Sequence, residues 1–174
     1  MEAEGTLAVV AEISIAFTGF AGIVGALASG RLRPTHPHVW LPFWAMIEGG
    51  LGTLFAALFP VLPYYLGLSE RIVWAASSSF IVILIVCHVV FMSPRFIRAM
   101  RNSSWVRMLA LEIPLQSALV IALLSQLLNA LGIGLQQSVG GFLIGLYFLL
   151  LISGLNFAYL IFVLVRPEDA SGDP

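Results

Sequence analysis

The hydrophobic residues of this chain fall into five long, nearly continuous runs that short polar segments separate. A transmembrane helix needs about 20 mainly apolar residues, and every run is long enough to supply them. The strands of a membrane barrel would be shorter and would alternate, whereas a helix satisfies its backbone hydrogen bonds within one segment. We therefore predict an all-α fold, an integral membrane bundle with helices at residues 7–29, 39–62, 72–92, 106–131 and 139–165.

Prolines mark several of the predicted helix ends. Pro60 and Pro63 close the second run, and Ser93-Pro94 ends the third. Pro114 falls inside the fourth run, where a missing N–H group predicts a kink. Residues 1–166 are predicted to form a single transmembrane domain, followed by a short polar tail at residues 167–174.

The arginines predict the orientation of the chain in the membrane. The chain has eight arginines and no lysine, and five crossings leave only Arg71 on one side. Because positive residues concentrate on the cytoplasmic side, the N-terminus is predicted to lie outside and the C-terminus in the cytoplasm. The seven arginines of the predicted cytoplasmic side are Arg31, Arg33, Arg95, Arg98, Arg101, Arg107 and Arg166.

Composition supports a bilayer as the main partner of the chain. Charged residues make up 10% of it, hydrophobic residues 60%, and the mean hydropathy is +1.01, whereas soluble domains carry about 25% charged residues. No basic domain is present, which argues against nucleic-acid binding. The sequence contains no HExxH, P-loop or GxSxG motif and its loops are short, so an enzyme is not favoured and no catalytic or metal-binding residue is predicted. Cys87 lies within an apolar run and is expected to be buried.

Small residues recur at helical spacing in three of the predicted helices. Such stripes allow helices to approach closely in a membrane. They indicate either packing within the bundle or a contact between subunits, and the second interpretation predicts a homo-oligomer or a subunit of a larger membrane complex. The stripes are Ala11, Ser14, Thr18, Ala21, Gly25 and Ala28 in the first helix, Ala45, Gly49, Gly52 and Ala56 in the second, and Gly141 and Gly145 in the fifth.

Four ionisable residues stand out away from the ends of the predicted spans: Glu12, Glu48, His88 and Glu112. Each costs about 2.5–3.5 kcal/mol on insertion scales, so each is a candidate functional residue. Glu12 and Glu48 lie beside small-residue stripes and are predicted to face protein or a cavity. His88 and Glu112 lie at similar depth on consecutive helices and are predicted to pair, either to tie the helices together or to handle a proton.

Polar residues suggest a path through the bundle. Gln116 and Gln126 are assigned to the same side of the fourth helix as Glu112, and Asn156 adds a polar group to the fifth. With Glu12 and Glu48 they could conduct protons or small cations, or they could form interhelical hydrogen bonds worth about 0.6 kcal/mol each.

Two further classes of function stay open. His88 could hold a haem or contact a quinone, as in a membrane anchor subunit of a respiratory or photosynthetic complex. The chain could instead be a structural or assembly subunit. At the predicted cytoplasmic face, Arg31, Arg33, His36 and His38 are candidates for binding anionic lipid head groups.

The first helix also carries a recognisable sequence. Residues 11–23 read Ala-Glu-Ile-Ser-Ile-Ala-Phe-Thr-Gly-Phe-Ala-Gly-Ile. This segment, with the basic loop after it, resembles the start of small, uncharacterised bacterial multi-pass membrane proteins. The resemblance implies a location in the bacterial inner membrane, and it implies no particular activity.

Overall fold

A computed structural model describes residues 3–27, 37–100, 105–134 and 136–165, and these residues are helical apart from short turns. Five of the helices are long and apolar enough to cross a membrane, which confirms the predicted number of spans. The described helices are α1 (Glu4–Leu27), α2 (Pro37–Leu58), α3 (Val61–Tyr65), α4 (Glu70–Met100), α5 (Trp105–Leu131) and α6 (Val139–Val165).

Two helix ends differ from the prediction, and both differences involve proline. The second helix ends at Leu58, and Pro60 caps the separate short helix α3. The predicted end at Ser93-Pro94 is wrong, because α4 continues to Met100 with Pro94 inside it. Pro94 removes one helical hydrogen bond, the one to the carbonyl of Val90, and membrane helices tolerate such a loss. One residue further along, the guanidinium Nη1 of Arg95 donates to the carbonyl of Phe91 at 2.9 Å. Helix α5 likewise continues through Pro114.

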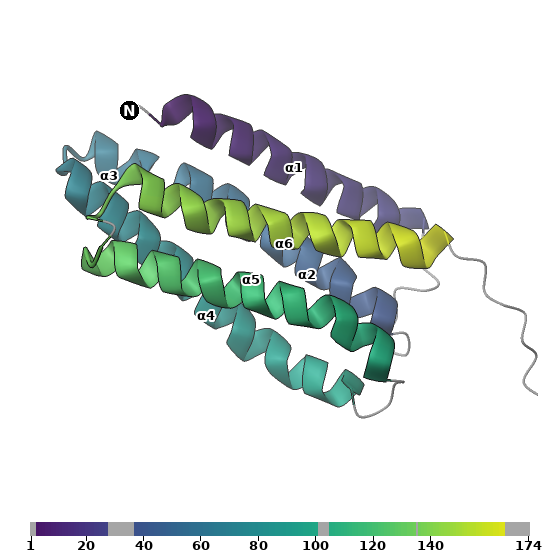
Figure 1. Cartoon of the computed structure of the whole chain (residues 1–174). Helices are drawn as coiled ribbons and strands as arrows, with labels where there is room; N and C mark the ends of the chain where they lie inside the picture. Colours follow the sequence, from purple (N-terminus) through teal and green to yellow (C-terminus); the bar gives the residue numbers. More distant parts are fainter. Residues whose placement is uncertain (1–2, 28–36, 101–104, 135, 166–174) are drawn as a thin grey trace, which may run out of the picture.

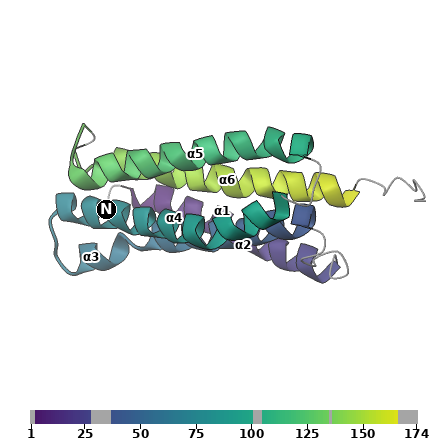
Figure 2. The same ribbon diagram turned by 90° about the horizontal axis from the view of Figure 1, so that it is seen from below.

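Helices α2, α4, α5 and α6 form a four-helix bundle, and α1 lies along its side against α2 (Figure 1). Three sides of the bundle are closely packed, namely α4 on α5, α5 on α6, and α6 on α2. Figure 2 shows α5 and α6 on one side of the molecule and α2 and α4 on the other. The fourth side, between α2 and α4, has the least contact, and it is the side that carries the candidate site.

The helices run alternately up and down between two ends. Helices α1, α4 and α6 begin at the end that carries α3, and α2 and α5 begin at the opposite end (Figure 1). Arg71 lies in the first turn of α4, whereas Arg95 lies toward the other end of this helix. Which end faces the cytoplasm stays a prediction from the arginines.

The small-residue stripe of α1 packs within the bundle. Ser14 and Ala21 are fully buried, and α1 lies against α2. A Cβ atom at Gly50 of α2 would come within 2.6 Å of Thr18 Oγ1, so the two helices touch where both residues are small. This stripe therefore serves ordinary helix packing; Ala28 lies outside the described residues.

Helices α5 and α6 are joined by two buried amides of α5. Gln126 donates from Nε2 to the carbonyl of Gly141 at 2.8 Å. Asn129 accepts the Ser138 N–H at 2.9 Å and donates to the Ser78 hydroxyl of α4 at 2.8 Å. In a membrane such bonds replace the hydrophobic force that lipid does not supply. Gly141 provides the space for Asn129 and Gly145 the space for Gln126, so this glycine stripe also serves internal packing.

Candidate functional site

The open side of the bundle contains a cavity of about 430 Å³ between α2 and α4. Its floor is formed by Leu119 of α5 and by Leu149 and Ile152 of α6. A Cβ atom at Gly52 would meet no atom within 4 Å, so this glycine of the α2 stripe leaves room between the walls. Gly49 instead lets α2 pack closely on Ser153 of α6. The size lies in the range of small-molecule sites, which are mostly apolar with a few polar groups.

Glu48 of α2 and His88 of α4 form the polar centre of this cavity. His88 Nδ1 lies 3.2 Å from Glu48 Oε2, and the side chains are 30% and 37% exposed, respectively. Both residues lie within helices long and apolar enough to span a membrane. Each of these groups is costly at membrane depth, and the contact between them offsets part of that cost.

The predicted partner of His88 was Glu112, whose side chain lies outside the described residues. The described partner is Glu48, which is 40 positions away in the sequence. Helices α4 and α5 do pack against each other, as a short connection predicts. His88 nevertheless faces α2, because the ring lies on the wall of the α2–α4 cavity.

Two more reactive side chains line the same cavity. Cys87 is exposed, so the expectation that it is buried is wrong. It directly precedes His88, on the surface of α4 that borders the opening of the cavity. Arg95 lies two turns beyond His88 and adds a positive charge to the lining. The cavity therefore combines an apolar floor with a carboxylate, an imidazole and a guanidinium.

The histidine geometry leaves one ring nitrogen available to a ligand. Nδ1 faces Glu48, and no hydrogen bond joins Nε2 to a described residue. A carboxylate at one ring nitrogen fixes the tautomer and orientation of the imidazole and so prepares the other nitrogen for a ligand or a metal. No group of three or more His, Cys, Asp and Glu side chains that could hold a metal ion occurs among the described residues.

The other predicted path residues do not gather around this site. Glu12 is exposed on α1, so the prediction that it faces protein is wrong for the single chain. One residue turns a helix by about 100°, which carries Glu12 away from its buried neighbour Ala11. Asn156 is buried in α6 and donates to its own helix, at the carbonyl of Ile152.

Gln116 and Gln126 also lie on different faces of α5. Gln116 is exposed, whereas Gln126 is fully buried against α6, and the assignment of both to one polar arc is wrong. Ten residues rotate a helix by about 1,000°, which leaves the two side chains roughly 80° apart. The candidate lipid-binding side chains Arg31, Arg33, His36 and His38 lie outside the described residues.

Sequence reasoning found Glu48 and His88 separately and missed their pairing. The periodicity within one helix does not show which other helix a residue faces, so it could not indicate that these two residues, on the second and third spans, face each other. It also missed Asn129, although an asparagine just before the Gly132-Ile-Gly134 turn was a visible signal for a buried polar contact at the hairpin.

Comparisons with protein-family models, curated proteins and solved structures found no match to this chain. The site therefore has to be interpreted from its own chemistry.

Proposed function

We propose that this chain is a multi-pass membrane protein that binds a hydrophobic ring compound with hydrogen-bonding oxygens, of the quinone class, in the α2–α4 cavity. The observation that carries the proposal is the Glu48–His88 contact of 3.2 Å on the wall of a largely apolar cavity of about 430 Å³. The apolar floor suits a ring and its tail. The Nε2 atom of His88 suits a carbonyl or hydroxyl oxygen.

The pair also offers such a ligand two hydrogen-bonding states. When Glu48 is protonated, its O–H group donates to Nδ1 of His88, and Nε2 carries a hydrogen that donates to a ligand carbonyl. When Glu48 is ionised, Nδ1–H donates to the carboxylate and Nε2 accepts a hydrogen bond from a ligand hydroxyl. The same two side chains therefore suit both the oxidised and the reduced forms of a quinone.

Haem binding and ion conduction are the competing functions. A haem on His88 would use the same carboxylate-oriented imidazole. Conduction has less support, because Glu12 and Gln116 are exposed on helices α1 and α5, outside the cavity that holds Glu48.

The test is to purify the protein into lipid nanodiscs and measure both its visible spectrum and its binding of a short-chain benzoquinone. We expect a colourless protein that binds the quinone saturably. A Soret band in the spectrum would contradict the quinone proposal and favour haem binding instead. Proton flux in proteoliposomes, together with an absence of quinone binding, would also contradict the proposal and favour proton conduction.

We also propose that the chain assembles with a second copy of itself in a bacterial inner membrane, with its N-terminus outside. Support for the location comes from the resemblance of residues 11–23, and support for the orientation from the arginines. Support for the assembly comes from a second small-residue stripe on α1. It points away from the bundle and consists of Gly5, Ala8, Ala16, Gly19 and Ala26, all of them exposed, with the exposed Glu12 and Ile23 on the same face.

This outward stripe is suited to another helix. A Cβ atom at Gly5 or Gly19 would meet no atom within 4 Å, so nothing described in the chain covers it. Glu12 lies in the middle of the stripe and within a membrane-spanning length of helix. Facing lipid, this carboxyl group is costly. In a two-fold dimer it would lie opposite its own copy, where two carboxyl groups can share a proton.

Gly19→Leu is expected to convert this dimer into monomers, because a branched side chain separates helices that touch along a small stripe. Native mass spectrometry of protein released from nanodiscs measures the copy number. Ile13→Phe, which adds bulk to a neighbouring exposed face of α1, serves as the control and should remain dimeric. A monomeric wild-type protein, or a dimer that survives Gly19→Leu, would contradict the proposal.

A further inference from the structure

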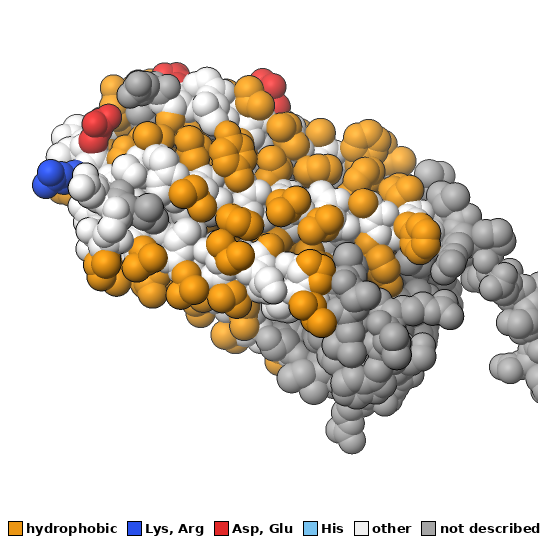
Figure 3. All heavy atoms as spheres, in the orientation of Figure 1, with side chains coloured by type: hydrophobic (Ala, Val, Ile, Leu, Met, Phe, Trp, Pro, Cys, Tyr) orange, Lys and Arg blue, Asp and Glu red, His pale blue; other side chains and the backbone are white. Residues whose placement is uncertain are grey.

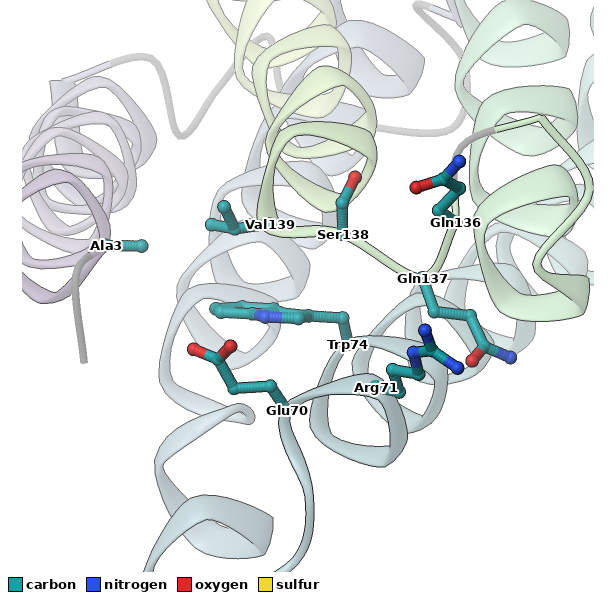
Figure 4. A pocket seen from close by; sticks show the side chains of 8 residues that line it. All are labelled: Ala3, Glu70, Arg71, Trp74, Gln136, Gln137, Ser138 and Val139. Carbon is teal, nitrogen blue, oxygen red and sulfur yellow. The ribbon is translucent and has the colours of Figure 1, made fainter.

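A second cavity, of about 290 Å³, opens at the end of the bundle where α1, α4 and α6 begin. Figure 4 shows its lining side chains, of which Glu70, Arg71 and Trp74 come from α4, and Gln136, Gln137 and Ser138 from the connection between α5 and α6. None of its lining residues belongs to the cavity of Glu48 and His88.

The cavity presents two opposite charges at separate positions. Glu70 and Arg71 are consecutive, and since one residue turns a helix by about 100°, their side chains diverge. In Figure 4 the carboxylate of Glu70 lies beside Trp74, whereas the guanidinium of Arg71 lies beside Gln137. Neither forms an ion pair within the described part of the chain, so both charges are available to a ligand.

The walls around these charges are held firmly in place. Trp74 is only 4% exposed, and its ring lies 5.7 Å from that of Phe142. On the opposite wall, Gln136 and Gln137 both have φ of 52°, a conformation that costs about 1–2 kcal/mol for each residue. The next residue is anchored by the side chain of Asn129, which bonds both the N–H and the carbonyl of Ser138. Trp74 and Ser138 are therefore fixed by the fold, whereas the side chains of Glu70, Arg71 and Gln136 are exposed.

We propose that this cavity binds a compact zwitterion, an ammonium group joined by a short chain to a phosphate. Glu70 would bind the ammonium group through its carboxylate. Arg71 would bind the phosphate through its planar guanidinium, assisted by the amides of Gln136 and Gln137. Two sources share this chemistry, the head group of phosphatidylethanolamine and free phosphoethanolamine.

The position of the cavity suits a ligand at the membrane surface. Tyr64 and Tyr65 of α3 are exposed at the same end of the bundle. Aromatic residues of this kind concentrate at head-group depth. A carboxylate and a guanidinium at this depth meet the two charges of a zwitterionic lipid directly.

The experiment compares lipids retained by the purified protein from nanodiscs that contain equal amounts of phosphatidylethanolamine, phosphatidylglycerol and phosphatidylcholine. Native mass spectrometry should show phosphatidylethanolamine enriched about fivefold or more over the other two. Glu70→Gln should remove the preference over phosphatidylglycerol, which has a phosphate and no ammonium group. Arg71→Gln should reduce retention of both. Ser117→Ala, an exposed change on α5, should retain the wild-type pattern.

Titration of free phosphoethanolamine into protein that lacks the lipid separates the two sources. If phosphoethanolamine binds saturably and Arg71→Gln weakens this binding, the cavity also binds the free molecule. If only the lipid is enriched, the cavity binds the lipid head group alone. Equal retention of all three lipids with no binding of phosphoethanolamine would overturn the inference. So would enrichment that survives both substitutions. The quinone experiment tests residues of the other cavity, so a protein that binds no quinone would leave the inference about phosphoethanolamine unaffected.

Discussion

His88→Leu is expected to weaken the binding of a short-chain benzoquinone by up to about tenfold. A hydrogen bond between two neutral groups contributes about 0.5–1.5 kcal/mol, and every 1.4 kcal/mol changes a dissociation constant tenfold. Leucine fills a similar volume on the wall of the cavity and keeps its apolar character. The loss would therefore report the missing ring nitrogen rather than a collapsed site. Equilibrium titration in nanodiscs measures the effect.

Two substitutions at Glu48 distinguish its role in orienting the His88 ring from the effect of its negative charge. Glu48→Leu leaves Nδ1 of His88 without its partner and should weaken binding by about tenfold, as loss of an orienting carboxylate does at other histidine sites. Glu48→Gln can still donate a hydrogen bond to Nδ1, so the affinity for the oxidised quinone should stay within about threefold of the wild type.

The control for this series is Glu4→Gln, an exposed acidic residue in the first turn of α1. It should bind quinone like the wild type. If Glu48→Leu and His88→Leu also bind like the wild type, the pair does not hold the ligand and the proposed function fails. Because leucine favours membrane insertion, poor folding is not the expected cause of a loss in either variant.

Gly141→Ala is expected to lower the free energy of unfolding by about 1–3 kcal/mol, the usual cost of overfilling a packed site. A Cβ atom at this position would collide with the side chain of Asn129. That amide cannot move aside without losing its bonds to Ser78 and Ser138. Unfolding in mixed detergent micelles, followed by circular dichroism, measures the change.

The neighbouring glycine provides a matched control. At Gly140 a Cβ atom would meet nothing closer than the hydroxyl of Ser138 at 4.0 Å, and the residue is exposed. Gly140→Ala should leave stability unchanged or raise it by up to about 1 kcal/mol, since alanine has the higher helix propensity. Equal effects at Gly140 and Gly141 would show that the amides of α5 do not fix the α5–α6 contact.

The sequence by itself determined the five spans and most of their boundaries. Length and apolarity along one segment are enough for this, because each membrane helix satisfies its own backbone hydrogen bonds. The bounds of α6 agree with the predicted residues 139–165. The prediction was wrong at Pro94, because a proline removes one hydrogen bond from a helix without having to end it, and the surroundings of the helix decide whether it continues.

The tertiary structure decided which polar groups meet. Glu48 pairs with His88 because α2 and α4 border the open side of the bundle, and this relationship depends on how the two helices are rotated toward each other. The two stripes of α1 are both composed largely of small residues, yet one is buried on α2 and the other is uncovered. Periodicity defines the faces of a helix, whereas the packing of all the helices together selects the face that each neighbour covers.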